Sequence, residues 1–281
     1  MIGETFSFSH ALFTALTNTL GGRSTQLSSW RKTLRASTTI AMVVISIAIL
    51  FNLETLTPRV VAIGVTGGLI GGLGLPLVYQ AFASGSVSFV SPVVALVHSF
   101  NLILFAVIVK NEKLSWAFPI AALFGVVGLF ACSRTSSTQA SASFKVFALA
   151  ALAGCCFTVF TSFMTLIEQD EILAALFGGR IGVLLVSFIF PPKKESKKVA
   201  KEASKDWRKF ALLSGLSEVL GNLAYMLAIA NLDLSKVGVF MTLAPVLAAL
   251  ISIKLLKQKP LLINWLGLAA TTTALAIIAV I

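Results

Sequence analysis

Charged residues are scarce in this sequence. Only 12% of the 281 residues are Asp, Glu, Lys or Arg, whereas 57% are apolar and the mean hydropathy is +0.94. Ordinary globular proteins carry roughly 25% charged residues, so a soluble fold of this composition could not cover its surface with polar groups. The composition therefore excludes a soluble domain and predicts an integral membrane protein for which lipid is the solvent.

The sequence patterns of enzymes and metal sites are also missing. The chain has no HExxH, GxSxG or Walker-type sequence, and its two histidines, His10 and His98, are 88 residues apart. The three cysteines, Cys132, Cys155 and Cys156, have no metal-ligand spacing and are interpreted as small packing residues. We therefore expect no catalytic residues, no metal and no cofactor.

Long apolar runs dominate what is present. Ten runs of about 18 residues or more are long enough to cross a bilayer as helices. They are 5–22, 33–51, 60–82, 88–109, 115–133, 144–167, 171–190, 208–230, 235–255 and 261–281. The first run is the most polar, so nine spans with this run in the membrane interface remain an alternative. The prediction is an all-α integral membrane protein with about ten transmembrane helices.

Basic residues are unevenly divided between the two sets of alternate connections. Of the 22 Lys and Arg residues, 17 lie in the connections after odd-numbered spans, four lie in the other set, and Arg180 lies inside a span. By the positive-inside rule the richer side is cytoplasmic, which places both termini outside the cell. The stretch from Lys193 to Lys209 holds eight of these basic residues and is interpreted as a topology determinant, with lipid or partner binding as the alternative.

A weak internal repeat divides the chain into two units. An offset of 147 residues aligns 73–122 with 220–269 at ten identical positions and superposes spans 3, 4 and 5 on spans 8, 9 and 10. Because five crossings are an odd number, the second unit would enter the membrane inverted. We expect one unit at 1–135 and another at 143–281, with the basic loop 191–207 inside the second. Inverted repeats are typical of transporters whose substrate site lies near the bilayer midplane.

Several short stretches carry a family resemblance. They are Tyr79-Gln80-Ala81-Phe82-Ala83, Lys110-Asn111-Glu112-Lys113, Gly125, Gly128, Arg180, Ala228 and Pro245-Val246. On these residues the chain resembles the drug/metabolite transporter superfamily, specifically its EamA-type ten-helix members. The resemblance implies two inverted five-helix halves and a central cavity lined by spans 1, 3, 4, 6, 8 and 9. It also implies cytoplasmic termini, which opposes the charge count.

Polar side chains deep in the spans are the candidate substrate-binding or coupling residues. Arg180 and Glu218 are the only formally charged residues near span centres, where an unpaired charge is costly. They form either a structural salt bridge or a site that couples to substrate or protons. The further candidates share helical faces within spans 1, 3, 4 and 8. They are His10, Gln80, His98, Asn101, Asn222 and Tyr225.

Glycine marks one face of span 3. Gly68 and Gly72 are four residues apart and continue toward Pro76 and Gln80, a spacing typical of close helix packing. We expect Gly72 to lie at a close contact, and Gly64 to tolerate a larger side chain more readily.

The function that fits these features is that of a secondary transporter in the cell (inner) membrane. It would move a small polar or amphipathic metabolite, such as an amino acid, nucleoside-like or amine compound, by alternating access with ion coupling or exchange. A channel or structural membrane subunit, and a membrane-embedded enzyme, are the alternatives. The expected partners are the small-molecule substrate and membrane lipids, with no nucleic acid, and the apolar last span is compatible with a homodimer.

Overall fold

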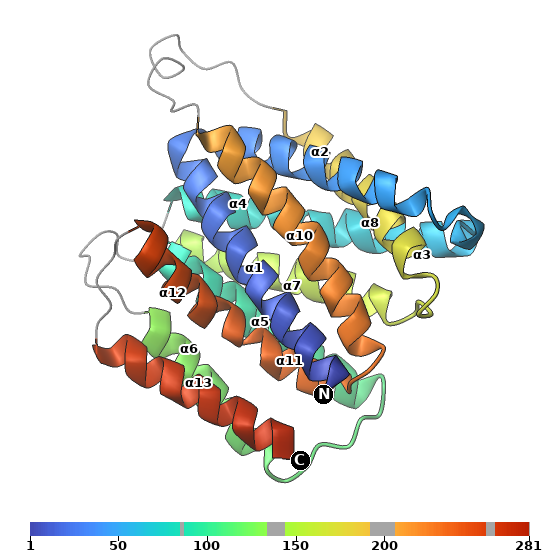
Figure 1. Ribbon diagram of the computed structural model, residues 1–281. Coiled ribbons are helices and arrows are strands. Elements are labelled where there is room, and N and C mark those ends of the chain that lie inside the picture. Colours follow the sequence, from blue (N-terminus) through green and yellow to red (C-terminus); the bar gives the residue numbers. More distant parts are fainter. Residues whose placement is uncertain (85–86, 134–143, 192–205, 257–261, 281) are drawn as a thin grey trace.

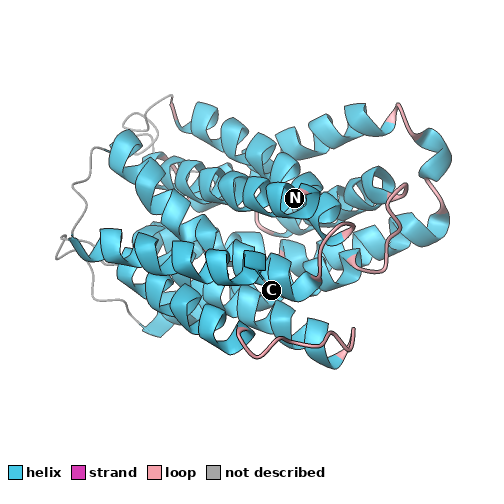
Figure 2. Ribbon diagram, turned by 60° about the horizontal axis from the view of Figure 1, so that its bottom comes forward, coloured by secondary structure: helices cyan, strands magenta, loops and turns pink. Residues whose placement is uncertain are grey.

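A computed structural model describes residues 1–84, 87–133, 144–191, 206–256 and 262–280. All regular secondary structure in these ranges is helical, so the predicted all-α class is confirmed for them (Figures 1 and 2). The elements are α1 (Ile2–Leu27), α2 (Trp30–Ile49), η1 (Leu53–Thr55), α3 (Pro58–Gly72), α4 (Gly74–Ser84), α5 (Val87–Ile108), α6 (Phe118–Ser133), α7 (Phe144–Met164), α8 (Ile172–Ile189), α10 (Trp207–Ile229), α11 (Leu234–Met241), α12 (Leu243–Leu256) and α13 (Leu262–Val280).

The helices have the length and surface of membrane spans. Within the described ranges, six stretches are long and apolar enough to cross a bilayer: α2, α3 with α4, most of α5, α7, α8 and α10. Shorter apolar stretches lie in α6 and across α11 and α12. Large apolar side chains point outward, among them Ile47 and Leu123, which are 56% and 63% exposed. Such a surface is suited to lipid, and the chain is a multi-pass membrane protein.

Two of the apolar stretches are each divided into two helices by a proline. α3 gives way to α4 at Leu73, three residues before Pro76, and α11 gives way to α12 at Thr242, three residues before Pro245. Proline lacks an N–H, and its ring clashes with the carbonyl four residues earlier. At both breaks the backbone tightens, and the N–H of the break residue bonds to the carbonyl three residues earlier, at 3.2 Å and 3.0 Å.

α3 and α8 pack backbone to backbone through glycines. A Cβ added to Gly64 would collide with the carbonyl oxygen of Ala175, and one added to Gly68 would collide with the backbone of Gly179. The expectation that Gly64 tolerates a larger side chain is wrong, because it belongs to the same close contact. Gly72 lies at this contact as expected, since its added Cβ would be 3.0 Å from a backbone atom of α8. The interface therefore requires small residues along α3.

α1 is polar because it lies inside the bundle. It runs along α10, as Figure 1 shows, and its buried residues include His10 and several hydroxyl side chains. Many of these hydroxyls bond back to their own helix; for example, Ser7 donates to the Gly3 carbonyl at 2.8 Å and Thr25 donates to the Gly21 carbonyl at 2.9 Å. The low hydropathy of the first predicted span therefore reflects its protein contacts.

The two ends of the bundle differ in the elements they bring together. At one end, which we call the basic end, the Ser24 hydroxyl at the end of α1 contacts Thr33 Oγ1 at 2.8 Å and donates to the Trp207 carbonyl at 3.0 Å. At the other, the terminal end, Lys110 Nζ donates to the Thr165 carbonyl at 3.2 Å. Figure 1 shows both chain termini at the terminal end.

The two larger of the apolar clusters in the bundle meet α8 on either side of its centre. One includes Leu176 and Tyr225, and the other includes Val183 and Tyr79. On α8, Leu176 and Val183 flank Arg180, so this arginine lies where the chain passes from one cluster to the other. The fold thereby places the charged side chain at mid-helix, inside the protein.

Candidate functional site

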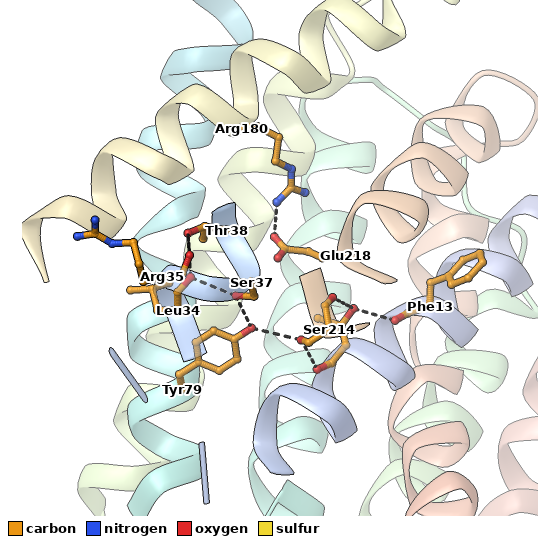
Figure 3. A network of polar contacts seen from close by, with 10 residues as sticks. Phe13, Leu34, Arg35, Ser37, Thr38, Tyr79, Arg180, Ser214 and Glu218 are labelled. Atoms are coloured by element: carbon orange, nitrogen blue, oxygen red, sulfur yellow. Dashed lines mark hydrogen bonds and ion pairs between the residues drawn. The ribbon is translucent and has the colours of Figure 1, made fainter. Parts of the chain in front are cut away.

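Arg180 and Glu218 form an ion pair in the middle of the bundle. Arg180 is near the centre of α8, and Glu218 is near the centre of α10. Arg180 Nη1 lies 2.6 Å from Glu218 Oε1, and the two side chains are 4% and 13% exposed. Figure 3 shows the guanidinium pointing directly at the carboxylate. The second carboxylate oxygen, Oε2, is buried and has no hydrogen-bond partner among the described residues.

A hydroxyl network lies next to this pair. The buried Tyr79 hydroxyl lies 3.4 Å from both Ser37 Oγ and Ser214 Oγ, and Ser214 donates to the Thr17 carbonyl at 3.0 Å (Figure 3). The network joins α1, α2, α4 and α10. Gly21 leaves room for it, since an added Cβ there would be 2.8 Å from the Tyr79 ring. These contacts connect helices of both expected repeat units beside the ion pair.

A second polar group surrounds Tyr225. His10 Nδ1 lies 2.8 Å from the Gly221 carbonyl, and because a carbonyl only accepts, this nitrogen carries the proton. The His10 ring lies 5.4 Å from that of Tyr225, and the Tyr225 hydroxyl donates to the Thr161 carbonyl at 3.2 Å. His98 Nε2 lies 3.2 Å from the Thr161 hydroxyl. The predicted candidates Tyr225 and His98 are thus linked through Thr161 of α7, and His10 joins them through its ring contact with Tyr225.

The other predicted residues are not joined to these groups. Gln80 and Asn222 are partly buried, and neither makes a hydrogen bond within the described part of the chain. Asn101 Nδ2 approaches the sulfur of Cys155 at 3.6 Å, on an exposed part of α7. Of the eight candidates, the structure therefore gathers Arg180 with Glu218, and three more around Thr161.

Two residues that the sequence reasoning did not select have prominent positions. Tyr79 is fully buried, whereas its neighbour Gln80 is only partly so. The stripe of four-residue spacings pointed to Gln80, but four residues overshoot one helical turn by about 40°, so such a stripe drifts away from the face on which it begins. Tyr79 follows Gly72 by seven residues, almost two full turns, and so stays on the buried face. The second is Glu112, whose carboxylate accepts from the N–H groups of Leu234 and Ser235 at 2.9 Å and 3.0 Å.

Glu112 joins the two halves at the terminal end. Its loop follows Asn111, which takes a left-handed conformation with φ 54° that asparagine adopts more readily than most residues. The carboxylate then caps the N-terminus of α11, where unpaired N–H groups and the helix dipole favour a negative charge. A cavity of about 300 Å³ lies beside it, lined also by Lys110, Gln169 and Asp233. In the sequence, the Lys110–Lys113 stretch was the feature that could have indicated this contact.

The central ion pair can accept a hydrogen bond or a proton. Glu218 neutralises Arg180, so the pair presents no free positive charge, while Oε2 retains an unused acceptor. An unsatisfied buried acceptor costs about 1–3 kcal/mol, which a proton, an N–H or an O–H at that oxygen would remove. The pair is therefore able to respond to a donor that enters the bundle.

Comparisons with known proteins agree with this fold. Residues 141–280 match the model of the EamA-like transporter family. No curated protein matches the chain. A solved structure, described only as a crystal structure of a protein, aligns over 99% of this chain and 97% of its own, with a TM-score of 0.75 and 18% identity. At that identity the likeness concerns the fold alone, whereas the family match concerns the sequence itself. The chain is thus a member of the EamA-like transporter family.

Proposed function

We propose that this protein is a secondary transporter that moves a small polar or amphipathic metabolite by alternating access, with the Arg180–Glu218 pair at its binding or coupling site. The observation that carries the proposal is the buried ion pair, whose Oε2 has no hydrogen-bond partner in the described part of the chain. Charged side chains near the centre of a membrane bundle are rare and mark substrate or proton pathways. Membership of a transporter family supports the same conclusion.

The proposed architecture is ten crossings in two inverted five-helix units. The packing partners support it, because they repeat when each helix is exchanged for its counterpart five spans away. The counterparts are α1 and α7, α2 and α8, α3 with α4 and α10, and α5 and α12. The contact of α1 with α10 corresponds to that of α7 with α3 and α4, and the contact of α3 with α8 corresponds to that of α10 with α2. Likewise, the contact of α5 with α7 corresponds to that of α12 with α1. α6 and α13, which are counterparts, pack on each other (Figure 1). Such a pseudo-twofold arrangement places a shared site at the interface of the halves.

The substrate proposal follows from the hydrogen-bonding capacity of the site. Oε2 of Glu218 accepts, and the Arg180 charge is already neutralised, so the site favours a ligand that contributes N–H or O–H donors. Amines, amino acids and nucleoside-like compounds carry such donors. A proton on the same oxygen would supply the coupling. The cell (inner) membrane is the location proposed.

Transport by the purified protein tests this proposal. A metabolite library is first screened for ligands that raise the thermal stability of the protein, since a ligand bound only by the folded state stabilises it. Uptake of each stabilising compound is then measured in proteoliposomes. We expect saturable uptake that responds to a proton or substrate gradient. Glu218→Gln should abolish the uptake or its pH dependence, whereas Glu54→Gln, which removes the same charge at an exposed position, should leave it unchanged.

Three outcomes would contradict the proposal. Flux that rises linearly with substrate concentration would indicate a channel. A folded Glu218→Gln protein with wild-type uptake across pH 5 to 8 would remove Glu218 from the site. Absence of uptake for all stabilising compounds, in either membrane orientation, would favour a structural subunit.

A further inference from the structure

An apolar groove lies at the basic end between α2 and α10. Its volume is about 330 Å³, and its lining includes Lys32, Arg35, Ala36, Ile40, Trp207 and Leu212. It lies outside the close contact of the two helices, where a Cβ on Gly215 would collide with the Ser37 carbonyl. The groove is therefore separate from the Arg180–Glu218 pair.

The walls of this groove offer hydrocarbon and little else. Ala36 and Ile40 line the α2 side, and Leu212, which is 44% exposed, lines the α10 side. The one hydroxyl in the lining, that of Thr39, donates to the Arg35 carbonyl at 2.7 Å. An apolar chain can therefore lie along the groove without burying an unpaired hydroxyl.

The mouth of the groove is basic. Lys32 and Arg35 line it, and the Arg208 guanidinium lies 5.7 Å from the centre of the Trp207 ring. Asp206, at the start of α10, precedes Trp207 and is an acidic residue in the described part of this end. Lysine and arginine predominate here, and tryptophan is favoured where lipid headgroups meet the hydrocarbon core.

Arg35 is held in place by contacts with α8. Its Nη2 donates to the Ser187 carbonyl at 3.3 Å, and its guanidinium carbon lies 4.1 Å from the centre of the Phe188 ring. A guanidinium has five N–H donors in a planar fork, and the printed contact to Ser187 uses only one of them. A guanidinium fixed in this way is suited to a phosphate oxygen.

We propose that this groove binds one anionic phospholipid, with its phosphate at Lys32 and Arg35 and an acyl chain along Ala36 and Leu212. A charged mouth that continues into an apolar groove matches a lipid, which carries both groups, better than a free anion, which would leave the apolar walls unused. By the positive-inside rule this end is cytoplasmic, the side on which anionic lipids attract basic segments. The proposal does not depend on the transport function.

Lipid binding by the full-length protein in detergent tests the proposal. Binding is counted by native mass spectrometry with phosphatidylglycerol, with phosphatidylcholine of the same acyl chains, and with inorganic phosphate. We expect one phosphatidylglycerol to bind in preference to phosphatidylcholine. Lys32→Gln should weaken phosphatidylglycerol binding about fivefold, the effect of one basic residue near a lipid surface. Arg31→Gln removes the same charge from the adjacent residue, which stacks on Trp30, and should have little effect.

A second variant tests the acyl-chain part of the groove. Ala36→Phe keeps every charge but fills the groove, and it should reduce phosphatidylglycerol binding as strongly as Lys32→Gln does. If Ala36→Phe does not fold, Leu212→Trp at the exposed opposite wall gives the same test. Equal binding of both lipids, wild-type binding by the groove-filling variant, or displacement of the lipid by inorganic phosphate would each overturn the proposal. None of these measurements involves transport, so the proposed function stands or falls separately.

Discussion

A double-mutant cycle on Arg180 and Glu218 separates the structural interpretation of the ion pair from the functional one. Arg180 Nη1 and Glu218 Oε1 lie 2.6 Å apart, and the side chains are only 4% and 13% exposed, so each charge depends mainly on the other for its stabilisation. Glu218→Gln would leave the arginine buried without a counter-charge. Breaking a buried pair in this way costs about 3–5 kcal/mol, whereas replacing both charges is often close to neutral.

The expected free energies of unfolding follow from that asymmetry. Each single substitution, Glu218→Gln or Arg180→Gln, should destabilise the protein by about 3–5 kcal/mol, and the double substitution by no more than about 1 kcal/mol. Unfolding in detergent with added denaturant measures all four proteins under one condition. Additive losses, with the double variant the least stable, would refute the claim that the two charges depend on each other.

Transport by the double variant then tests the functional interpretation of the ion pair. A stable double variant that no longer transports shows that the charges serve the substrate or the proton. Recovery of both stability and transport would assign the pair to structure alone, and would move the site toward His98, Asn101 and Asn222. The exposed Glu54→Gln variant should match the wild type in both measurements.

Three further predictions concern packing, the terminal end and topology. Gly64→Ala should lower the free energy of unfolding by about 1–3 kcal/mol, because the new Cβ would collide with the backbone of α8. Gly125→Ala should be tolerated, because the nearest atom to its new Cβ would be 3.4 Å away. Unfolding in detergent compares the two variants. Glu112→Gln should lower the free energy of unfolding by roughly 1 kcal/mol, because it weakens the cap of α11, whereas Lys113→Gln should not. Equal melting temperatures of the two variants would show that the cap does not stabilise the protein. A cysteine at Lys209 should resist an impermeant thiol reagent in intact cells, and one added after the C-terminus should react; the reverse pattern would show that the family arrangement prevails over the charge count.

The deep charges could be identified from the sequence because membrane solvation leaves them few alternatives. A charge at mid-span must find a partner inside the bundle. Arg180 and Glu218 were the only two such residues, so their pairing was one of two expected outcomes, and the ion pair is observed. His10, His98 and Tyr225 were expected on inward faces, but their link through Thr161 requires α7 to lie between α5 and α10.

The failed or missed assignments trace to tertiary geometry. Gly64 appeared tolerant because sequence spacing cannot tell which glycine faces another helix at its point of closest approach. Tyr79 was passed over for Gln80 because a spacing of four residues drifts round the helix, whereas Tyr79, seven residues after Gly72, keeps to the buried face.

Composition determined that this is a membrane protein, since a chain with 12% charged residues cannot be solvated by water, and the long apolar runs determined that its spans are helical. The mid-span positions of Arg180 and Glu218 were also evident, because they depend only on distance along the chain. Only the tertiary structure decided which partners these residues meet, that one carboxylate oxygen has no partner among the described residues, and that Glu112 caps α11. Those contacts join residues that are 38 and 122 positions apart, and no local pattern specifies how distant helices rotate against each other.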